Sequence, residues 1–512
     1  MTALAPEDEL RACLRALQAI DADRSLLTRL TEAERRELLV LAGRITTPDR
    51  GALRRMARAF RRGEREAARR QDEAALAQAG LRVQRLRETY APLWLTPPPA
   101  ADAAAAGGPS LHGARNCYVC KQAFTAVHRY YDSMCRDCGD FNYAKREQSA
   151  DLGGRVALVT GARVKIGFQA ALKLLRAGAH VVALTRFPVD AAARYAREPD
   201  YADWSQRLQV HGLDLRHTPS VELFARWLGG QLPRLDYIVN NACQTVRRPA
   251  GFFRHLLAAE AQGAAALPPA QRAPLARHEA LCRALLDAPG HEAPRDAGRE
   301  LMPHAAHGYP EGLVHSAALS QRHYLDEDYL AGEALFPAGR YDEDSQQLDL
   351  RSVNSWRLRL HEVETPELLE VQLVNAIAPY ILNARLKPLM LKSGARDLHI
   401  VNVSAMEGQF YRTTKTDKHP HTNMAKAALN MMTRTSAPDY VRDGIHMNAV
   451  DTGWVTDEDP VVHAARKAEE GFAPPLDIID GAARIVDPVF AGVNSGIHQW
   501  GQFLKDYRPA AW

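Results

Sequence analysis

Apolar and polar residues recur with two different periods along the chain. Within residues 1–95, apolar positions such as Leu10, Leu14 and Leu17 repeat every three or four residues, which is the spacing of one face of a helix. From residue 152 onwards, short apolar runs rich in β-branched residues alternate with amphipathic segments. That alternation is typical of a parallel sheet between two layers of helices. The pattern predicts a helical N-terminal region followed by a doubly wound α/β domain.

The most informative stretch is Arg155–Gly178, RVALVTGARVKIGFQAALKLLRAG. Its first part, Val156–Val159, predicts a buried parallel strand, and the amphipathic part at its end predicts a helix. In the turn between them, Gly161 allows a sharp change of direction and Gly167 allows a close approach to a pyrophosphate. Backbone N–H groups and the positive end of the helix dipole face this turn, which suits it to phosphate binding. A second strand, His180–Thr185, completes a βαβ unit.

The same alternation continues towards the C-terminus. Further strands are predicted at Leu208–Leu215, Leu235–Ala242, Leu398–Val403 and Ile445–Val450, and further helices at Val221–Leu228, Pro366–Leu391 and Thr422–Arg434. Between them, residues 244–351 are rich in Ala, Pro, His and Arg and show no strand alternation. Compact domains rarely contain a loop of that length, so this stretch is predicted to be an insertion with helical pieces such as His278–Leu286.

A second signal lies between the helical region and the α/β domain. Residues 96–115 begin with a tract rich in proline and alanine, TPPPAADAAAAGGPS, which predicts a linker. Two Cys-x-x-Cys pairs follow, namely Cys117, Cys120, Cys135 and Cys138. The two sulfurs of each pair reach one ion, so the pairs predict a tetrahedral zinc site in a small zinc-ribbon-like module over residues 116–145. Because four thiolates leave no open coordination position, the zinc is expected to be structural.

Composition narrows the class of protein. Of the 512 residues, 46% are hydrophobic and 25% charged, and a net charge of +4 gives no case for a nucleic-acid partner. The arginine-dense segment 54–70 includes Glu64 and Glu66, which favours a solvated helix face over a site for a nucleic acid or an acidic partner. Seven cysteines, an odd number, favour metal in a reducing compartment. The absence of a membrane-length apolar run and the acidic N-terminus predict a cytoplasmic location.

Seven short motifs follow one another between residues 152 and 512. They are Thr160-Gly161-x-x-x-x-Ile166-Gly167, Asp214-Leu215, Asn240-Asn241-Ala242, Asn375 in VNAIAPYIL, Asn402-Val403-Ser404, Lys426 in AKAALNMMTRT, and Asn448-Ala449-Val450-Asp451-x-Gly453. As an ordered set they resemble the motifs of the short-chain dehydrogenase/reductase family. The resemblance implies a Rossmann domain that binds a nicotinamide dinucleotide and transfers hydride to or from a small-molecule carbonyl, alcohol or enone substrate. The expected cofactor-binding residues are Gly161, Arg163, Lys165, Ile166, Gly167, Arg186, Asp214, Leu215, Asn241, Ala242, Lys426 and Gly453.

Charge near the first turn bears on which dinucleotide binds. An acidic residue at the end of the second strand would accept a ribose 2′-OH and repel a 2′-phosphate. Here that strand ends in Thr185-Arg186, and the first turn carries Arg163 and Lys165. Three cations near one phosphate favour NADP over NAD. Asp190 lies several residues too far along the chain to be the acidic residue that would accept the ribose 2′-OH.

The expected catalytic residues match the family only in part. Lys426 and Asn375 fit the family's lysine and helix-borne asparagine, but the position four before the lysine is Thr422 and not tyrosine. The serine position is filled by Ala405, with Ser404 one residue earlier. Threonine is a far weaker acid than tyrosine, so Thr422 cannot simply take over the proton transfer.

Two functions from different classes follow. In the first, the protein is an NADP-dependent oxidoreductase whose proton donor lies between Ser404 and Lys426, where Tyr411, His419 and His421 are candidates. In the second, the domain binds NADP without turnover and acts as a scaffold through its zinc module and helical region, which is also where a protein partner is expected.

The substrate pocket is expected to be walled by the insertion, the loop from Gly408 to His421 and the segment Trp454–Pro475. The helices 366–391 and 422–434 resemble the family's dimer-forming helices. Apolar residues such as Leu429, Met431 and Met432 lie in the second of these, so a homodimer is expected, with burial under the insertion as the alternative.

Overall fold

The computed structural model describes residues 7–85, 109–287, 310–330, 332–342, 346–411, 415–456, 458–469 and 473–512. The chain forms two compact units, Met1–Ala74 and Ala75–Trp512.

The first unit is helical, as the sequence predicts. Its elements are α1 (Glu7–Ala22), a 3-10 turn η1 (Arg24–Arg29), α2 (Glu32–Thr46) and most of α3 (Arg50–Leu76). A capping box starts α2, because the side chain of Thr31 accepts from the backbone N–H of Glu34 and the Glu34 carboxylate accepts from the backbone N–H of Thr31. The apolar stripe of α1 is not buried, since Leu10 is 61% exposed. The arginine-dense segment lies on α3, where Arg62 pairs with Glu66 at 2.8 Å and both side chains are exposed.

The second unit begins with a small module around the four cysteines. It comprises α4 (Gly80–Arg85), the antiparallel strands β1 (Ser110–Asn116) and β2 (Ala123–Ala126), and α6 (Arg136–Glu147). The predicted linker therefore ends earlier than expected, because Ser110 to Arg115 belong to β1, which pairs with β2. The rest of the predicted linker, up to residue 108, falls outside the described residues.

The core of the α/β domain is an eight-stranded sheet with the order β10-β9-β8-β7-β6-β3-β4-β5. Its strands are β3 (Val156–Thr160), β4 (His180–Thr185), β5 (Leu208–Gly212), β6 (Tyr237–Asn240), β7 (Leu398–Ser404), β8 (Ile445–Asp451), β9 (Phe503–Lys505) and β10 (Arg508–Ala510). All neighbours run parallel except β9 and β10. Strands β3, β6, β7 and β8 are buried at every residue, which explains their uninterrupted apolar runs.

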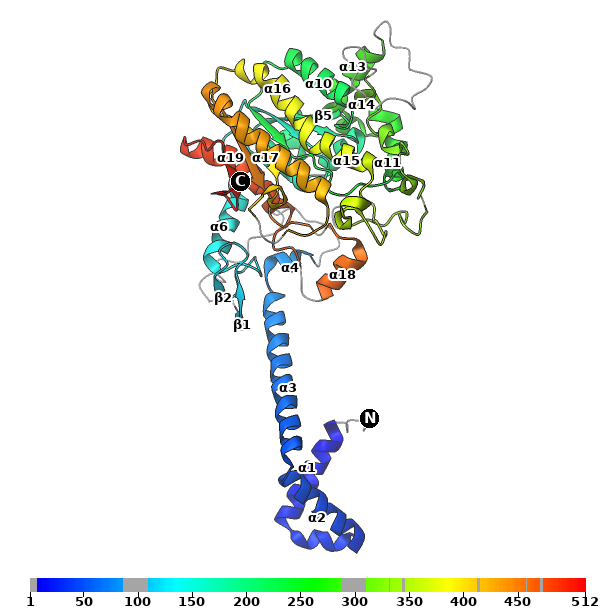
Figure 1. Ribbon diagram of the computed structural model, residues 1–512, viewed down its shortest axis with the longest axis vertical. Helices are drawn as coiled ribbons and strands as arrows, with labels where there is room; N and C mark the ends of the chain where they lie inside the picture. The colour runs from blue at the N-terminus through cyan, green and yellow to red at the C-terminus, as the bar shows by residue number, and fades with distance from the viewer. Residues whose placement is uncertain are drawn as a thin grey trace. The chain divides into compact units, whose positions relative to one another are not determined.

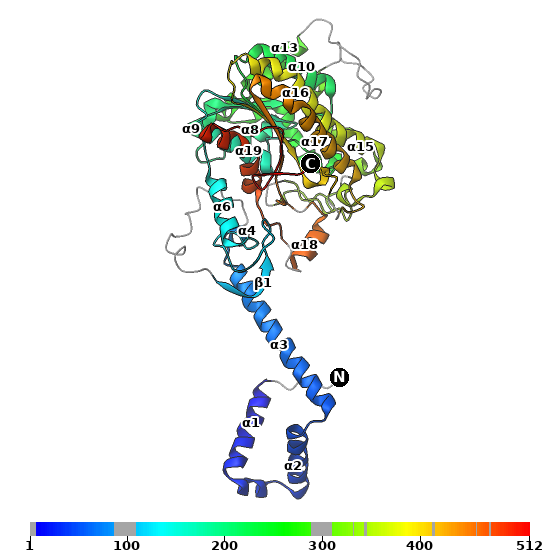
Figure 2. The same ribbon diagram turned by 60° about the vertical axis from the view of Figure 1, so that its left-hand side comes forward.

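Helices cover both faces of this sheet, so the predicted doubly wound Rossmann fold is confirmed (Figures 1 and 2). On one face, α7 (Lys165–Arg176), α8 (Pro188–Tyr195) and α19 (Ile478–Ser495) pack on the odd residues of β3 and β7. On the other face lie α10 (Thr218–Gln231), α16 (Ala378–Leu391) and α17 (Pro420–Tyr440). Further helices are α9 (Tyr201–Trp204) and α18 (Val461–Glu469).

The predicted helix 366–391 is not continuous. It divides into α15 (Thr365–Gln372), a π-helical turn at Leu373–Ile377, and α16. Pro379 has no N–H to donate to the carbonyl of Asn375, and its ring crowds that carbonyl, so the helix widens at this point. The wide turn contains Asn375, one of the predicted site residues.

Two predicted strands end earlier than expected, and both ends bear on the site. β5 stops at Gly212, because the backbone N–H of Asp214 donates to Gly312 of the insertion and not to the sheet. β6 stops at Asn240, which leaves Asn241 and Ala242 in the following loop. Both segments therefore leave the sheet at its carboxyl edge, where ligands bind in open α/β sheets.

The insertion folds into short helices. They are α11 (Ala250–Gln262), α12 (Pro269–Arg272), α13 (Ala276–Leu286), α14 (Glu311–Val314) and the 3-10 turns Gly263–Ala266, Ala273–Leu275, Ala318–Gln321 and Asp326–Tyr329. An aromatic cluster of Phe252, Phe253 and Phe336 packs on Phe187, which follows β4. The insertion is thus folded and packs on the domain at the carboxyl edge of the sheet.

Candidate active site

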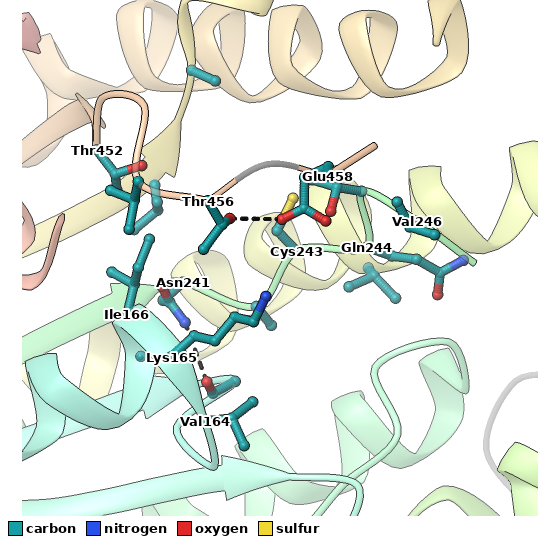
Figure 3. Close-up of a pocket in the computed structure, with 18 of the residues that line it drawn as sticks. Val164, Lys165, Ile166, Asn241, Cys243, Gln244, Val246, Thr452, Thr456 and Glu458 are labelled. Atoms are coloured by element: carbon teal, nitrogen blue, oxygen red, sulfur yellow. Dashed lines mark hydrogen bonds between the residues drawn. The ribbon is translucent and has the colours of Figure 1, made fainter. Parts of the chain in front are cut away.

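A cavity of about 970 Å³ lies at the carboxyl ends of the parallel strands (Figure 3). Every residue that the sequence predicts to bind the cofactor lines it: Gly161, Arg163, Lys165, Ile166, Gly167, Arg186, Asp214, Leu215, Asn241, Ala242, Lys426 and Gly453. Strand order brings them together, because the loops after β3, β4, β5, β6, β7 and β8 all open on the same edge.

The glycine turn after β3 is held by contacts that exclude side chains. Gly161 has φ +65°, and a Cβ there would meet the Cα of Ala242 at 2.8 Å. A Cβ on Gly167 would lie 2.2 Å from both the carbonyl oxygen of Gly161 and Nδ2 of Asn241. That same Nδ2 donates to the carbonyls of Thr160 and Gly161 at 3.1 and 3.2 Å. The turn and the end of β6 therefore form one rigid support.

Lys165 occupies the position of the family's middle glycine and has the left-handed φ of +54°. Such a conformation is uncommon for a residue with a side chain. Burial raises the pKa of Glu458, but the charge of Lys165, together with that of Arg248, holds it below its usual value. The carboxylate of Glu458 also accepts from the hydroxyl of Thr456 at 2.9 Å, in front of Lys165 (Figure 3). Lys165 thus already has an acidic neighbour.

The three predicted phosphate-binding cations differ in their surroundings. Arg163 is ion-paired with Asp190 at 2.6 Å, so it is already neutralised within the chain. Arg186 instead lies over the rings of Phe253 and Phe187, at 4.8 and 5.6 Å from their centroids, and pairs with no carboxylate of the described residues. Burial, followed by the charge of Arg216, lowers its pKa to about 10. Within the described residues, Arg186 is therefore a cation at the cavity wall that forms no direct ion pair, although the charges of Asp214 and Glu370 act on it.

Asp214 is buried and already has a partner. Its carboxylate accepts from Arg216 at 2.6 Å, and the same guanidinium donates to Glu370 of α15 at 2.8 Å. Burial opposes ionisation, but Arg216 holds the pKa of Asp214 below its usual value. Asp214 lines the cavity as part of this ion-pair chain.

Ser404 and Lys426 lie at the inner end of the cavity. Nζ of Lys426 donates to the carbonyl of Val403 at 2.8 Å, which fixes it beside the end of β7. The hydroxyl oxygen of Ser404 is buried and has no hydrogen-bond partner among the described residues. A buried polar group without a partner in a native fold calls for an explanation, and a bound ligand is one that this cavity can provide.

Asn375 lies outside the cavity and holds one of its walls in place through hydrogen bonds. Its Oδ1 accepts from the backbone N–H of Gln244 at 2.7 Å, and its Nδ2 donates to the carbonyl of the same residue at 3.2 Å. The wide π turn points this side chain at the loop after β6. Both of its functional groups are used there, so Asn375 positions the cavity wall and is not among the residues that line the cavity.

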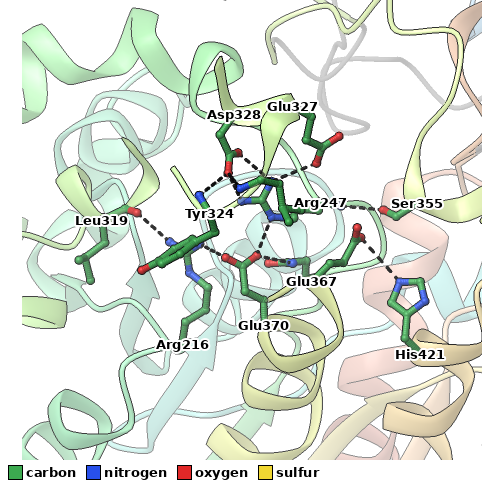
Figure 4. Close-up of polar contacts among 12 residues, drawn as sticks. Arg216, Arg247, Leu319, Tyr324, Glu327, Asp328, Ser355, Glu367, Glu370 and His421 are labelled. Carbon is green, nitrogen blue, oxygen red and sulfur yellow. Dashed lines mark hydrogen bonds and ion pairs between the residues drawn. The ribbon is translucent and has the colours of Figure 1, made fainter. Parts of the chain in front are cut away.

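The predicted proton donors do not line the cavity. Tyr411 is 54% exposed, and the hydroxyl of Thr422 is buried without a partner among the described residues. His421 is buried and faces Glu367 of α15, with 3.7 Å between Nε2 and Oε1 (Figure 4). His419 stacks on Trp356 at 3.9 Å, and it is Trp356 that lines the cavity. His421 and Thr422 lie on the first turn of α17, which packs against α15, and His419 directly precedes this turn.

Of the three walls expected for the substrate pocket, two are found. The insertion contributes Arg247, Arg248, Phe252 and Phe253, and the segment after β8 contributes Trp454 to Thr456, Glu458 and Lys467. Within the described residues of the loop from Gly408 to His421, none lines the cavity. Arg247 ties the insertion to the rest of the site, since it pairs with Asp328 at 2.7 Å and with Glu370 at 3.3 Å (Figure 4).

The four cysteines come together as the spacing predicts. Their sulfurs lie within 4.8 Å of one another, and Sγ of Cys120 and Cys135 are 3.7 Å apart. Sulfurs on a tetrahedral zinc ion at 2.3 Å would be about 3.8 Å apart. Burial opposes ionisation of Cys117, but N–H groups of Cys135, Cys120 and Val119 point at its sulfur and lower its pKa to about 7. The arrangement fits a structural four-thiolate zinc site.

The cysteine module also forms part of the cavity, which the sequence did not predict. Tyr118 and Lys121, which lie beside the cysteines, line it. The phenol oxygen of Tyr118 accepts from the backbone N–H of Trp454 at 3.0 Å, directly after Gly453. The adjacency of Tyr118 to Cys117 gives no signal for this contact, because it depends on the docking of the module.

Buried charges hold the module in place. Arg146 of α6 is fully buried and donates to both carboxylate oxygens of Asp477, the residue that caps α19. It also lies 3.1 Å from Asp480, which accepts from the hydroxyl of Tyr131 at 2.6 Å. An unpaired buried charge is strongly unfavourable, so these pairs favour the position in which the module contacts α19.

None of the helices in the described part of the chain is long and apolar enough to cross a membrane.

Comparisons with known proteins agree with this architecture. Residues 155–260 match the family model described as short chain dehydrogenase, and residues 353–471 match the model described as Enoyl-(Acyl carrier protein) reductase. Between them lie residues 261–352, which are most of the segment predicted as an insertion.

Among curated proteins, an uncharacterized protein R665 of Acanthamoeba polyphaga mimivirus is 31% identical over 403 residues, which are 76% of this chain and 74% of that protein. Mouse retinol dehydrogenase 11 is 33% identical over 112 residues, 21% of this chain and 35% of the relative. A solved Burkholderia cenocepacia short chain dehydrogenase in complex with NADP is 16% identical, with a TM-score of 0.41 over 69% of this chain and 96% of its own. On the two family matches and the ordered site motifs, this chain belongs to the short-chain dehydrogenase/reductase family.

Proposed function

We propose that the protein is an NADP-dependent oxidoreductase that transfers hydride to or from a carbonyl, alcohol or enone substrate. The observation that carries the proposal is the buried hydroxyl of Ser404, which has no hydrogen-bond partner in the part of the chain that the structure describes and shares one cavity with Lys426 and the phosphate-binding turn. A cavity that only bound a dinucleotide would have no need for a buried donor at this place.

When bound, the nicotinamide supplies or accepts the hydride. Ser404 donates its hydrogen bond to the substrate oxygen and so stabilises the negative charge that develops there. Lys426 is fixed by the Val403 carbonyl, and its two remaining N–H groups are available for the ribose and for the proton transfer. In the reductive direction we assign Lys426 as the proton source and the Ser404 hydroxyl as the group that passes the proton on, in place of the missing tyrosine.

NADP is proposed over NAD because Arg186 forms no direct ion pair within the described residues. A partly buried guanidinium without a bound carboxylate has unused N–H donors, and a 2′-phosphate on the adenine ribose would accept from them. Arg163 contributes less than its position in the sequence suggests, since Asp190 already neutralises it.

We also propose that the four cysteines hold one structural zinc ion. Its role would be to shape the turn that carries Tyr118, which in turn holds the backbone of Trp454 at the cavity. The zinc itself would have no open position for chemistry.

The test is a single-turnover measurement of NADPH oxidation with a panel of aldehydes, ketones and enones. Ser404→Ala and Lys426→Ala should each slow the wild-type rate by about 10²–10⁴. Lys426→Ala should weaken NADPH binding modestly, and Ser404→Ala should leave it unchanged. Tyr411→Phe is the matched control, because this exposed tyrosine does not line the cavity and should be as fast as wild type.

Two outcomes would contradict the proposal. If wild type binds NADPH but oxidises it with no member of the panel, the protein is a cofactor-binding scaffold. If turnover survives Ser404→Ala and Lys426→Ala but is lost in Tyr411→Phe, the proton donor lies in the loop before α17 and our assignment is wrong.

A further inference from the structure

Three imidazoles meet at the edge of the sheet opposite the cofactor cavity. His399 is the second residue of β7, His446 is its register partner on β8, and His498 follows the end of α19. His399 precedes Ser404 by five residues on the same strand, which corresponds to about 16 Å of extended chain. The cluster is therefore separate from the site described above.

The spacing of the three rings matches that around one metal ion. One nitrogen of each ring lies within 4.8 Å of the others, and Nε2 of His399 is 3.0 Å from Nδ1 of His498. The ring centroids are 5.2, 5.1 and 4.7 Å apart. Nitrogens bound to a tetrahedral zinc ion would lie about 3.3 Å apart, with ring centres roughly 5 Å apart.

The surroundings orient one of the three rings, that of His446, as a metal ligand is oriented. Nδ1 of His446 lies 3.2 Å from the carbonyl oxygen of Leu398, a contact that places the proton on Nδ1 and leaves Nε2 free. His399 is fully buried, and its Nδ1 has no partner among the described residues.

Space for the ligand atoms depends on a glycine in the neighbouring helix. A Cβ at Gly492 of α19 would lie 2.4 Å from Nδ1 of His498 and 3.2 Å from Nε2 of His399. The helix thus lacks a side chain just where one would meet the two nitrogens that face each other.

We propose that His399, His446 and His498 form a second metal site, which takes a borderline divalent cation such as Zn²⁺, Co²⁺ or Ni²⁺. Solvent supplies the fourth ligand, since His498 is only partly buried and the nearby Asp397 is taken by Arg155. The ion is too far from the cavity for a part in hydride transfer. It would join β7 and β8 to the segment that leads into β9.

The experiment counts zinc per chain in the full-length protein after loading with Zn²⁺ and gel filtration. Wild type should hold about one ion more than His498→Ala, whatever the four-cysteine site contains. The exposed His180 on β4 provides the control, and His180→Ala should hold as much zinc as wild type. Added Zn²⁺ should raise the unfolding temperature of wild type and His180→Ala by more than that of His498→Ala.

Gly492→Ala is the second variant, because it leaves all three ligands in place and fills their space. Its affinity for Co²⁺ should fall about 100-fold. Binding at this site is followed by the visible absorption of Co²⁺ that has no thiolate-to-metal band, since the ligands here are imidazoles and not cysteines. Equal zinc content in wild type and His498→Ala would overturn the proposal. So would occupancy of this site only at millimolar Zn²⁺, since the cluster would then be a stack of neutral imidazoles.

Discussion

At the scale of single residues, the structure changes how much each of the three predicted cations is expected to contribute to the choice of cofactor. Arg163 is paired with Asp190, and the charge of Lys165 acts on Glu458. Arg186 forms no direct ion pair within the described residues, and the carboxylates of Asp214 and Glu370 act on it only at longer range. Cofactor preference should therefore depend on this one side chain more than on the charge of the turn as a whole.

Arg186→Asp is predicted to reverse the preference from NADP to NAD. The substitution replaces a charge-assisted contact with a repulsion, which should cost NADP binding roughly 1–3 kcal/mol. Dissociation constants for NADP and NAD would be measured by titration on wild type, Arg186→Asp and a control, Arg197→Asp. Arg197 is exposed and is not among the residues that line the cavity. Equal affinity of wild type for the two dinucleotides would refute the assignment.

Glu260 of the insertion is predicted to make the stability of the domain depend on pH. Burial raises its pKa to about 7, although its carboxylate accepts from the backbone N–H groups of Val189 and Asp190. Because the folded state holds the proton more tightly than the unfolded chain, stability is full below about pH 4.5 and falls as pH rises to about 7. The loss should be on the order of 3 kcal/mol.

This effect is measured as a difference between two proteins. The free energy of unfolding of wild type should decrease from pH 5 to pH 7.5 relative to Glu260→Gln, whose side chain cannot titrate. Removing one acceptor shifts the curve of the variant by an amount that does not depend on pH. Parallel curves for the two proteins would show that Glu260 is ionised throughout this range.

At the scale of elements, the cysteine module and the segment 452–480 act as one unit. Tyr118 holds Trp454, and Arg146 holds Asp477 and Asp480. An apolar cluster joins the module to Val455, Leu476 and Ile479. Loss of the metal should therefore affect the cofactor cavity as well as the module.

Cys120→Ser is predicted to lower the zinc content by one ion per chain and to weaken NADP binding while leaving the sheet folded. Cys120 is exposed, so the substitution removes a ligand without opening a cavity in the core. Metal analysis, NADP titration and far-ultraviolet circular dichroism measure the three effects. Cys13→Ser, at an exposed cysteine of α1, is the control. A folded wild-type protein without metal would contradict the zinc assignment.

At the scale of the whole molecule, an apolar face on the helices beyond the sheet remains uncovered. Tyr380 of α16 is 61% exposed, and Met431 and Met424 of α17 are 58% and 53% exposed. The described residues of the insertion leave these side chains exposed. Leu429, which the sequence placed on this face, is instead buried in the core of the domain.

We predict that two copies associate through this face of α16 and α17. Isologous packing of such faces gives a two-fold dimer. Light scattering should report a dimer for wild type at micromolar concentration and a monomer for Tyr380→Asp combined with Met431→Asp. A variant lacking residues 1–74 should remain dimeric and bind NADP, because those residues form a separate unit. If that variant were monomeric, the dimer contact would lie in the helical region and not on α16 and α17.

The sequence alone determined the order of elements in the domain. Buried parallel strands need unbroken apolar runs, and the turn at Gly161 and Gly167 needs residues without side chains, so local patterns were enough to place β3, β4, β7 and β8. The cysteine spacing likewise determined the four-sulfur cluster, because the ligands of each pair are close along the chain.

Only the tertiary structure decided which side chains meet in the cavity. The sequence placed His421 and Tyr411 near the reacting atoms, but packing of α17 on α15 turns His421 towards Glu367 and leaves Tyr411 in solvent. Tyr118 approaches Trp454 from more than 300 residues away, and His498 meets His399 across a strand and a helix. Contacts of this kind depend on how the helices, strands and modules pack on one another. The local periodicity of apolar residues carries no information about that packing.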